Sequence, residues 1–316
     1  MQFDTSIPGY PLAVIQAGQD VALPYGEAVT DADLKPYIDK VATSVTVGPV
    51  PEAQIEQKLL PQLAMRVGDA VNMDYIRHDL NVIGATGLFS TVKPSFTTVP
   101  EGVSLNYTVQ MNPVVKKIDI VGNESLSTGD LMKLVATTPG TTLNTAVVSH
   151  DVANINTAFA NAGYMMSRVS DVRLDDEGVL HIAISEPRIE NINLRGNTKT
   201  KNKVIMRELR MKKGDIFNKN AASRSIQRVY NTGYFEDVNV RLLPGQRNPK
   251  DVIVEIDVTE QKTGSVTIGA GYSDSDGLVG ILGLAETNLR GTGDKVNISW
   301  EFGGNTDTNK NYIFSY

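Results

Sequence analysis

The stretch that decides the fold is Ile118-Asp-Ile-Val-Gly-Asn-Glu-Ser125, because it recurs as Ile192-Asn-Leu-Arg-Gly-Asn-Thr-Lys199. Their glycines, Gly122 and Gly196, lie 74 positions apart, and Gly48 lies a further 74 positions back in Val45-Thr-Val-Gly-Pro-Val50. Each glycine follows a short alternating apolar stretch, which is typical of a strand that ends in a tight turn. The sequence therefore predicts an internal repeat of about 75 residues.

A second shared stretch marks the middle of each repeat. It reads Asn161-Ala-Gly-Tyr164 in the second repeat, Asn231-Thr-Gly-Tyr-Phe235 in the third and Ala85-Thr-Gly-Leu-Phe89 in the first. A helical pattern precedes it, and two alternating stretches follow it, so we expect the glycine to end a helix and the next residue to anchor a strand. Each repeat is predicted to run strand, helix, helix, strand, strand. The residues of these motifs are Gly122, Asn123, Gly196, Asn197, Gly163, Tyr164, Gly233, Tyr234 and Phe235.

The last part of the chain has another pattern. From residue 263 onward apolar and small or polar residues alternate, as in Val266, Ile268, Ala270 and Tyr272. Strands with one apolar face and aromatic residues near their ends are typical of a transmembrane β-barrel, although a soluble hairpin that covers a core has the same pattern. Because the sequence stops inside such a strand, we expect that the chain is truncated or that a partner supplies the missing strands.

These motifs together resemble a known family. The repeat resembles the polypeptide-transport-associated (POTRA) domain, and repeats that run into Gly269-Ala-Gly-Tyr272 and Asn288-Leu-Arg-Gly-Thr-Gly293 resemble the Omp85 family, most closely its BamA-like outer-membrane assembly proteins. The first repeat departs from the pattern, with Gly48-Pro49 in place of Gly-Asn and Leu88 in place of Tyr. The resemblance implies an α+β fold of three tandem POTRA domains followed by the first strands of a truncated transmembrane antiparallel β-barrel. The predicted domains are an extended lead-in at 1–35, POTRA-like domains at 36–113, 114–187 and 188–262, and the start of the barrel at 263–316.

The resemblance also implies a function. Such a protein lies in the bacterial outer membrane with its POTRA domains in the periplasm, where it receives unfolded outer-membrane proteins and assists their insertion. Periplasmic chaperones, accessory assembly proteins and outer-membrane lipid are the further partners expected. Two alternatives stay open: a related secretion or translocation pore for one dedicated substrate, and a soluble periplasmic scaffold.

Client binding has a physical basis in the closing strand pairs. An open strand edge offers unpaired backbone donors and acceptors, so an extended client can add itself as a strand, although an edge strand with no client looks the same in sequence. The first strand of each closing pair supplies the candidate edge, at 166–174 and 237–242. The candidate residues are Ser167, Val169, Asp171, Arg173, Val238 and Val240.

Charge is unevenly distributed along the chain. The net charge is −6, yet residues 188–262 carry 16 basic and 9 acidic side chains. A basic segment next to predicted membrane strands can meet anionic lipid headgroups, although a solvated charged face is equally consistent with it. The candidate contacts are Lys199, Lys201, Lys203, Arg207, Lys212 and Lys213.

Composition excludes several classes. A chain of 316 residues with 41% hydrophobic and 21% charged residues is not disordered, and the absence of cysteine excludes disulfides and thiolate sites. The three histidines, His78, His150 and His181, lie far apart in the sequence without metal-ligand spacing, and no nucleotide-binding or nucleophile motif occurs. We therefore expect no enzyme activity, no cofactor and no metal. Little aromatic interleaving in an acidic chain argues against nucleic acid as a partner.

Overall fold

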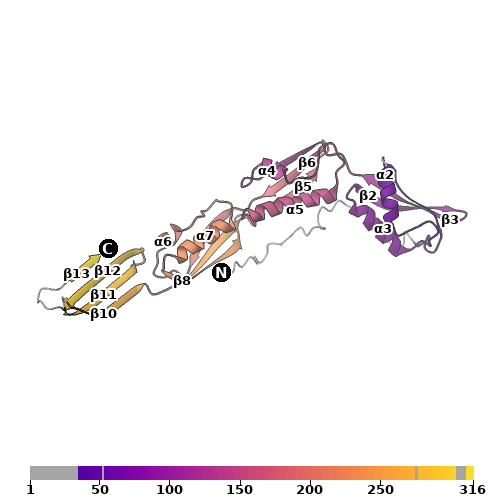
Figure 1. Ribbon diagram of the computed structural model, residues 1–316. Coiled ribbons are helices and arrows are strands. Elements are labelled where there is room, and N and C mark those ends of the chain that lie inside the picture. The colour runs from indigo at the N-terminus through magenta and orange to yellow at the C-terminus, as the bar shows by residue number, and fades with distance from the viewer. Residues whose placement is uncertain (1–34, 52, 275–276, 304–310) are drawn as a thin grey trace. The chain divides into compact units, whose positions relative to one another are not determined.

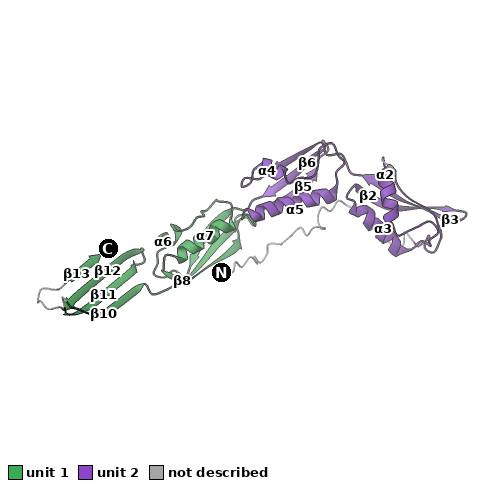
Figure 2. Cartoon of the chain, in the orientation of Figure 1, with its two compact units in different colours: residues 1–11, 163–166, 187–316 green, residues 12–162, 167–186 purple. Residues whose placement is uncertain are grey.

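The computed structural model describes residues 35–51, 53–274, 277–303 and 311–316 (Figure 1). The predicted lead-in therefore lies outside the described residues, apart from its last residue. The described chain forms two compact units (Figure 2). Residues 163–166 and 187–316 form unit 1, and the described residues up to 162 together with 167–186 form unit 2.

Unit 2 contains the first two repeats, each with a three-stranded sheet. In the first repeat, the sheet has the order β1-β3-β2, with β1 parallel and β2 antiparallel to β3. The second repeat has the same arrangement in the order β4-β6-β5. The elements of the first are β1 (Ala42–Val47), α2 (Ala53–Leu59), the 3-10 turn η1 (Leu60–Gln62), α3 (Met73–Ala85), β2 (Phe89–Val99) and β3 (Gly102–Met111). Those of the second are β4 (Lys117–Val121), α4 (Thr128–Met132), α5 (Thr145–Asn161), β5 (Arg168–Leu174) and β6 (Val179–Ser185).

Unit 1 contains the third repeat and a four-stranded sheet. The third repeat again has a mixed sheet, in the order β7-β9-β8. Its elements are β7 (Ile189–Arg195), α6 (Asn202–Met206), α7 (Lys219–Tyr230), β8 (Phe235–Pro244) and β9 (Val252–Glu260). The antiparallel sheet that follows consists of β10 (Gly264–Ser273), β11 (Gly277–Leu289), β12 (Asp294–Gly303) and β13 (Asn311–Ser315).

The longer helix of each repeat begins at an asparagine. Asn72, Asn144 and Asn218 are N-caps, and each side chain accepts a hydrogen bond from a backbone N–H of the first turn. Such a cap satisfies donors that have no partner within the helix. The apolar face of each helix then covers one face of its sheet, for example through Ile155 and Phe159 of α5, which are fully buried. Sequence periodicity and capping thus account for the helix positions.

A buried polar residue stabilises the loop between the two helices of each repeat. In the first repeat the Asp79 carboxylate accepts hydrogen bonds from the N–H groups of Ala64 and Met65 and from the Tyr107 hydroxyl. Asp151 does the same for Ala136 and Thr137 in the second repeat. Because burial and the Asp79 carboxylate both disfavour the ionised phenol, the pKa of Tyr107 is raised well above its usual range.

The four-stranded sheet has one strongly apolar face. Cross-strand rows on this face join apolar residues, such as Val266, Leu284, Ile298 and Phe314, or Ile268, Leu282, Trp300 and Tyr312. Many of these side chains are exposed, including Ile268 at 81% and Phe314 at 68%. The sheet is open, since β10 and β13 each have one neighbouring strand in the described part of the chain. None of the described helices is both long and apolar enough to cross a membrane.

Two features of the predicted motifs differ in the structure. Gly122 and Gly196 both have a φ of +83°, and a Cβ on either would collide with a carbonyl oxygen of the adjacent strand. Gly48 ends β1 but does not have a positive φ, because the chain turns there through Gly48-Pro49. Tyr164 does not begin a strand, since β5 starts at residue 168, whereas Phe89 and Phe235 each begin one.

Candidate functional site

Two strands with an open edge carry the predicted client-binding residues. Strand β5 pairs with β6 alone and β8 pairs with β9 alone among the described residues, so each presents one edge without a partner strand. Figure 1 shows β5 and β8 within their respective sheets. Whether a client binds there stays a prediction.

The open part of β5 is shorter than its sequence suggests. Ser167 precedes the strand and is buried, so it does not lie on the edge. The backbone N–H of Val169 donates to the Asn156 side chain of α5 over 2.8 Å, and the Val169 side chain is in the core. Asp171 and Arg173 are exposed. The edge available to another strand therefore lies at 171–174, because the Asn156 side chain occupies the N–H of Val169.

The edge of β8 is longer. The strand spans ten residues, and Val238 and Val240 point into the core while Asn239 and Arg241 are exposed between and beside them. Arg241 forms ion pairs with Glu255 over 3.1 Å and with Asp257 on the central strand β9. Charged and polar side chains along an edge discourage pairing between folded proteins, yet they leave the backbone groups available to an extended chain.

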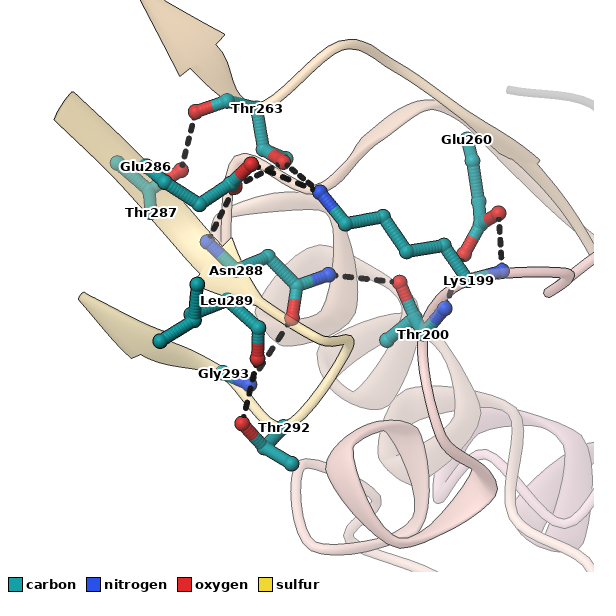
Figure 3. Close-up of polar contacts among 10 residues, drawn as sticks. All are labelled: Lys199, Thr200, Glu260, Thr263, Glu286, Thr287, Asn288, Leu289, Thr292 and Gly293. Carbon is teal, nitrogen blue, oxygen red and sulfur yellow. Dashed lines mark hydrogen bonds and ion pairs between the residues drawn. The ribbon is translucent and has the colours of Figure 1, made fainter. Parts of the chain in front are cut away.

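A polar junction joins the third repeat to the four-stranded sheet (Figure 3). Lys199 reaches from the loop before α6 to the four-stranded sheet. Its ammonium donates to Thr263 Oγ1, just before β10, over 2.8 Å and to Glu286 Oε2 on β11 over 3.0 Å. Asn288 at the end of β11 is 1% exposed. Its amide nitrogen donates to Thr200 Oγ1 over 2.9 Å, and its oxygen accepts from the N–H of Gly293 over 2.9 Å. The amide nitrogen and the amide oxygen of this buried side chain thus each have a hydrogen-bond partner.

The glycines of this motif allow close approach between the two parts. Gly291 has a φ of +73°, and a Cβ there would lie 1.8 Å from the carbonyl oxygen of Lys199. The carbonyl of Gly291 in turn accepts the N–H of Lys201 over 2.9 Å. Only glycine fits this position, so Asn288-Leu-Arg-Gly-Thr-Gly293 is a docking motif for the third repeat.

Glu260 holds the loop after β7 at the same junction. It accepts hydrogen bonds from the N–H groups of Thr198, Lys199 and Thr200, which lie in the loop after β7. Burial acts to raise its pKa, but the hydrogen bonds from Thr198, Thr200 and Lys199 outweigh burial and lower the pKa to about 2. Glu186 has the same relationship to Glu124 and Ser125 in the second repeat. Neither glutamate belongs to a motif predicted from the sequence, although their spacing of 74 positions equals that of Gly122 and Gly196.

The predicted headgroup contacts divide into two groups. Lys199 is engaged in the junction, so we assign it to docking rather than to lipid contact. Arg207 lies against Gly293 and pairs with Glu208 over 3.5 Å. Lys201, Lys203, Lys212 and Lys213 are exposed, and Lys201 adjoins the β11–β12 turn through its backbone. These four remain the candidate lipid contacts.

Comparison with known proteins identifies the repeats. Residues 113–186 and 187–261 match the POTRA model, described as "Surface antigen variable number repeat". These two segments are therefore POTRA repeats with a mixed α+β fold. The solved structure of the N-terminal domain of Omp85 from Thermosynechococcus elongatus is 27% identical, with a TM-score of 0.60 over 71% of this chain and 98% of that one. POTRA domains 1–3 of Omp85 from Anabaena give a TM-score of 0.60 at 26% identity, over 71% of this chain and 96% of that one.

Curated relatives agree with this result. The outer membrane protein assembly factor BamA of Neisseria meningitidis is 31% identical over 56% of this chain and 23% of its own length. Outer envelope protein 80, chloroplastic, of Oryza sativa is 25% identical over 76% of this chain and 38% of its own length. The chain thus spans about a quarter to two fifths of the length of these relatives. The resemblance to the Omp85 family and its BamA-like assembly factors is confirmed.

Proposed function

We propose, from its resemblance to the Omp85 family, that this chain receives unfolded outer-membrane proteins on its POTRA repeats and assists their assembly into the outer membrane. A client segment pairs with the open edge of β8 or of β5 and extends the sheet by one strand. Main-chain hydrogen bonds supply the affinity, so one edge serves clients of many sequences. Chaperones and accessory assembly proteins would deliver clients to the same repeats.

The observation that carries the proposal is the pair of open edges on POTRA repeats. Strand β8 is ten residues long and has one open edge. One face of its sheet is packed against helices, so the strand is held in place before a client arrives. Such preorganisation lowers the entropy cost of binding. Two relatives are named outer membrane protein assembly factors, which agrees with a client of this class.

The four-stranded sheet suggests the location. An exposed apolar face with paired aromatic residues, such as Trp300 and Tyr312 with centroids 6.1 Å apart, suits lipid rather than water. We infer that β10–β13 are the first strands of an outer-membrane barrel and that the POTRA repeats lie on its periplasmic side. The junction at Asn288 then holds the third repeat next to the membrane surface.

Proline substitution on β8 tests the edge. Along an edge strand, successive N–H groups point alternately toward the partner strand and toward the open side. Because Asn239 and Val240 are neighbours, one of the variants Asn239→Pro and Val240→Pro removes an N–H on the open side and keeps the hydrogen bonds with β9 intact. The variant whose circular dichroism stays native is used. We expect it to bind a urea-unfolded outer-membrane barrel protein about tenfold or more weakly than the unmodified chain does, because the ring removes an edge donor and blocks the neighbouring strand.

A cross-linking control identifies the contact. Because the chain has no cysteine, a single cysteine can be placed at Asn239 on the edge or at Arg224 on α7. A thiol-reactive client should couple to the first site and not to the second. Unchanged client binding by the native-like proline variant, or equal coupling at both sites, would contradict the proposal.

A further inference from the structure

The third repeat carries a pocket of about 500 Å³ whose wall contains three arginines. Arg224 and Arg228 lie one turn apart on α7, and Arg210 lies in the loop between α6 and α7. Ala221 and Gln227 of α7 complete the wall of this arginine pocket. All three arginines are exposed. Like charges four positions apart destabilise a helix, so their presence together calls for an explanation.

The fold holds two of these arginines in place. The backbone N–H of Arg210 donates to the buried Ser225 hydroxyl over 2.7 Å. Arg228 donates from Nε to the Glu208 carbonyl oxygen over 3.1 Å and from Nη2 to the Glu208 carboxylate over 2.8 Å. A guanidinium has five N–H groups, so these two bonds leave three of them available. Among the described residues, the guanidinium groups of Arg210 and Arg224 have no hydrogen-bond or ion-pair partner.

The second repeat shows that the shared fold does not require these arginines. The N–H of Ala136 donates to the buried Asp151 over 2.7 Å, as the N–H of Arg210 donates to Ser225. This bond sets the correspondence between the two repeats, at a spacing of 74 positions. The residues of the second repeat that match Arg210, Arg224, Ser225 and Arg228 are Ala136, His150, Asp151 and Asn154.

Charge therefore changes sign at this place from one repeat to the next. In the first repeat the N–H of Ala64 donates to the buried Asp79, and the matching residues are Ala64, His78, Asp79 and Val82. The first and second repeats thus each have one carboxylate and neither lysine nor arginine at these positions, whereas the third has three arginines and no carboxylate. Glu208 contacts the cluster, but it pairs with Arg207 as well as with Arg228, so positive charge stays in excess. Loss of a carboxylate together with gain of three cations favours an anionic ligand.

We propose that the arginine pocket binds a phosphate group. A phosphate monoester carries a charge of about −1.5 to −2 at neutral pH, and its oxygens point in different directions, so it accepts hydrogen bonds from more than one guanidinium at once. A carboxylate has a single charge and two oxygens in one plane, which one arginine already satisfies. Three arginines around one pocket therefore fit a phosphate better than an acidic side chain. The phosphate belongs either to a lipid headgroup or to a soluble compound, and the chemistry of the site is the same for both.

Calorimetric titration of inorganic phosphate into the full chain, in non-ionic detergent at neutral pH, tests the pocket. The double variant Arg210→Gln with Arg224→Gln removes two cations and keeps the backbone bond of residue 210. We expect it to retain a native circular dichroism spectrum and to bind phosphate about tenfold or more weakly than the unmodified chain. Arg247→Gln with Lys250→Gln in the β8–β9 loop removes the same charge and should weaken binding by less than about twofold. Equal losses for the two double variants, or no phosphate binding by the unmodified chain, overturn the inference.

Two further measurements identify the ligand. A blocked Glu-Glu dipeptide, which represents an acidic protein partner, should bind about tenfold or more weakly than phosphate, and binding as tight as that of phosphate overturns the inference in favour of such a partner. Flotation with phosphatidylcholine vesicles that contain phosphatidic acid separates the two sources of phosphate. If Arg210→Gln with Arg224→Gln lowers flotation and the control pair does not, the result supports a lipid phosphate. If the same variant loses phosphate binding with flotation unchanged, the result supports a soluble phosphate compound. Neither measurement depends on the client edges of β5 and β8, so the arginine pocket and the proposed function stand or fall separately.

Discussion

Asn288 Nδ2 donates to Thr200 Oγ1 over 2.9 Å, and this bond joins residues that are 88 positions apart in the sequence. The amide comes from the end of β11 and the hydroxyl from the loop before α6, so the bond links the four-stranded sheet to the third repeat. Both side chains are buried, at 1% and 3% exposure. In a buried site such a bond holds one orientation, because any rotation would leave polar groups without partners. Within unit 1 this bond therefore ties the four-stranded sheet directly to the third repeat.

Gly291→Ala should loosen the junction. The added Cβ would collide with the carbonyl oxygen of Lys199. The positive φ of residue 291 also disfavours alanine, so a steric cost and a conformational cost add. Gly214→Ala is the control, since its φ is +91° but nothing lies within 4 Å of the added Cβ. Only the conformational cost of about 1–2 kcal/mol applies there. Urea unfolding in mild detergent should show a clearly larger loss of stability for Gly291→Ala, and equal losses would contradict the close packing.

Glu260 should make the third repeat sensitive to acid. Its pKa is about 2 in the folded chain against 4.5 for an unperturbed glutamate, so the ionised form stabilises the fold. That stabilisation is complete above about pH 4.5 and disappears as the pH falls toward 2. Glu260→Gln should therefore be less stable than the unmodified chain at pH 7, with the difference vanishing near pH 2. Urea unfolding across this range measures it, and a difference independent of pH would contradict the assignment.

The sequence alone predicts much of the repeat architecture. The glycine turns at Gly122 and Gly196 and the alternation in the strands follow from local backbone preferences, which are visible in a short window of sequence. The alternation of Val266 and Ile268 likewise predicts one apolar face for β10, and the register aligns Val266 with the apolar Leu284 of β11.

Features that depend on distant contacts could not be predicted this way. The bond of the Val169 N–H to Asn156 shortens the open edge of β5, and the pairing of Lys199 with Glu286 removes a cation from the basic surface. Each depends on which residues folding brings together, and the sequence carries no local signal for either.

Asp79→Ala should strongly destabilise the first repeat. The substitution leaves the Met65 N–H and the Tyr107 hydroxyl without their 3.1 Å and 2.6 Å partners, and it also frees the Ala64 N–H. Each buried group without a partner costs about 1–3 kcal/mol, so a loss of about 3 kcal/mol or more is expected. Ser225→Ala in the third repeat should cost less, because the Ser225 hydroxyl accepts from one loop N–H, that of Arg210, and otherwise donates to the Ala221 carbonyl of its own helix. A larger loss for Ser225→Ala would contradict this ranking.

Charge reversal at Lys201 and Lys203 tests the lipid-facing surface. Both are exposed, the Lys201 N–H donates to Gly291 in the β11–β12 turn, and each cation near an anionic membrane contributes about 1 kcal/mol. We expect Lys201→Glu with Lys203→Glu to lower flotation with phosphatidylglycerol-containing vesicles about tenfold or more. Flotation with phosphatidylcholine vesicles, which measures insertion of the apolar sheet alone, should not change. Arg247→Glu with Lys250→Glu alters the net charge of the same repeat equally, in the loop between β8 and β9, at the opposite end of β9 from Glu260. If that pair lowers flotation as much, net charge rather than a defined headgroup surface governs binding.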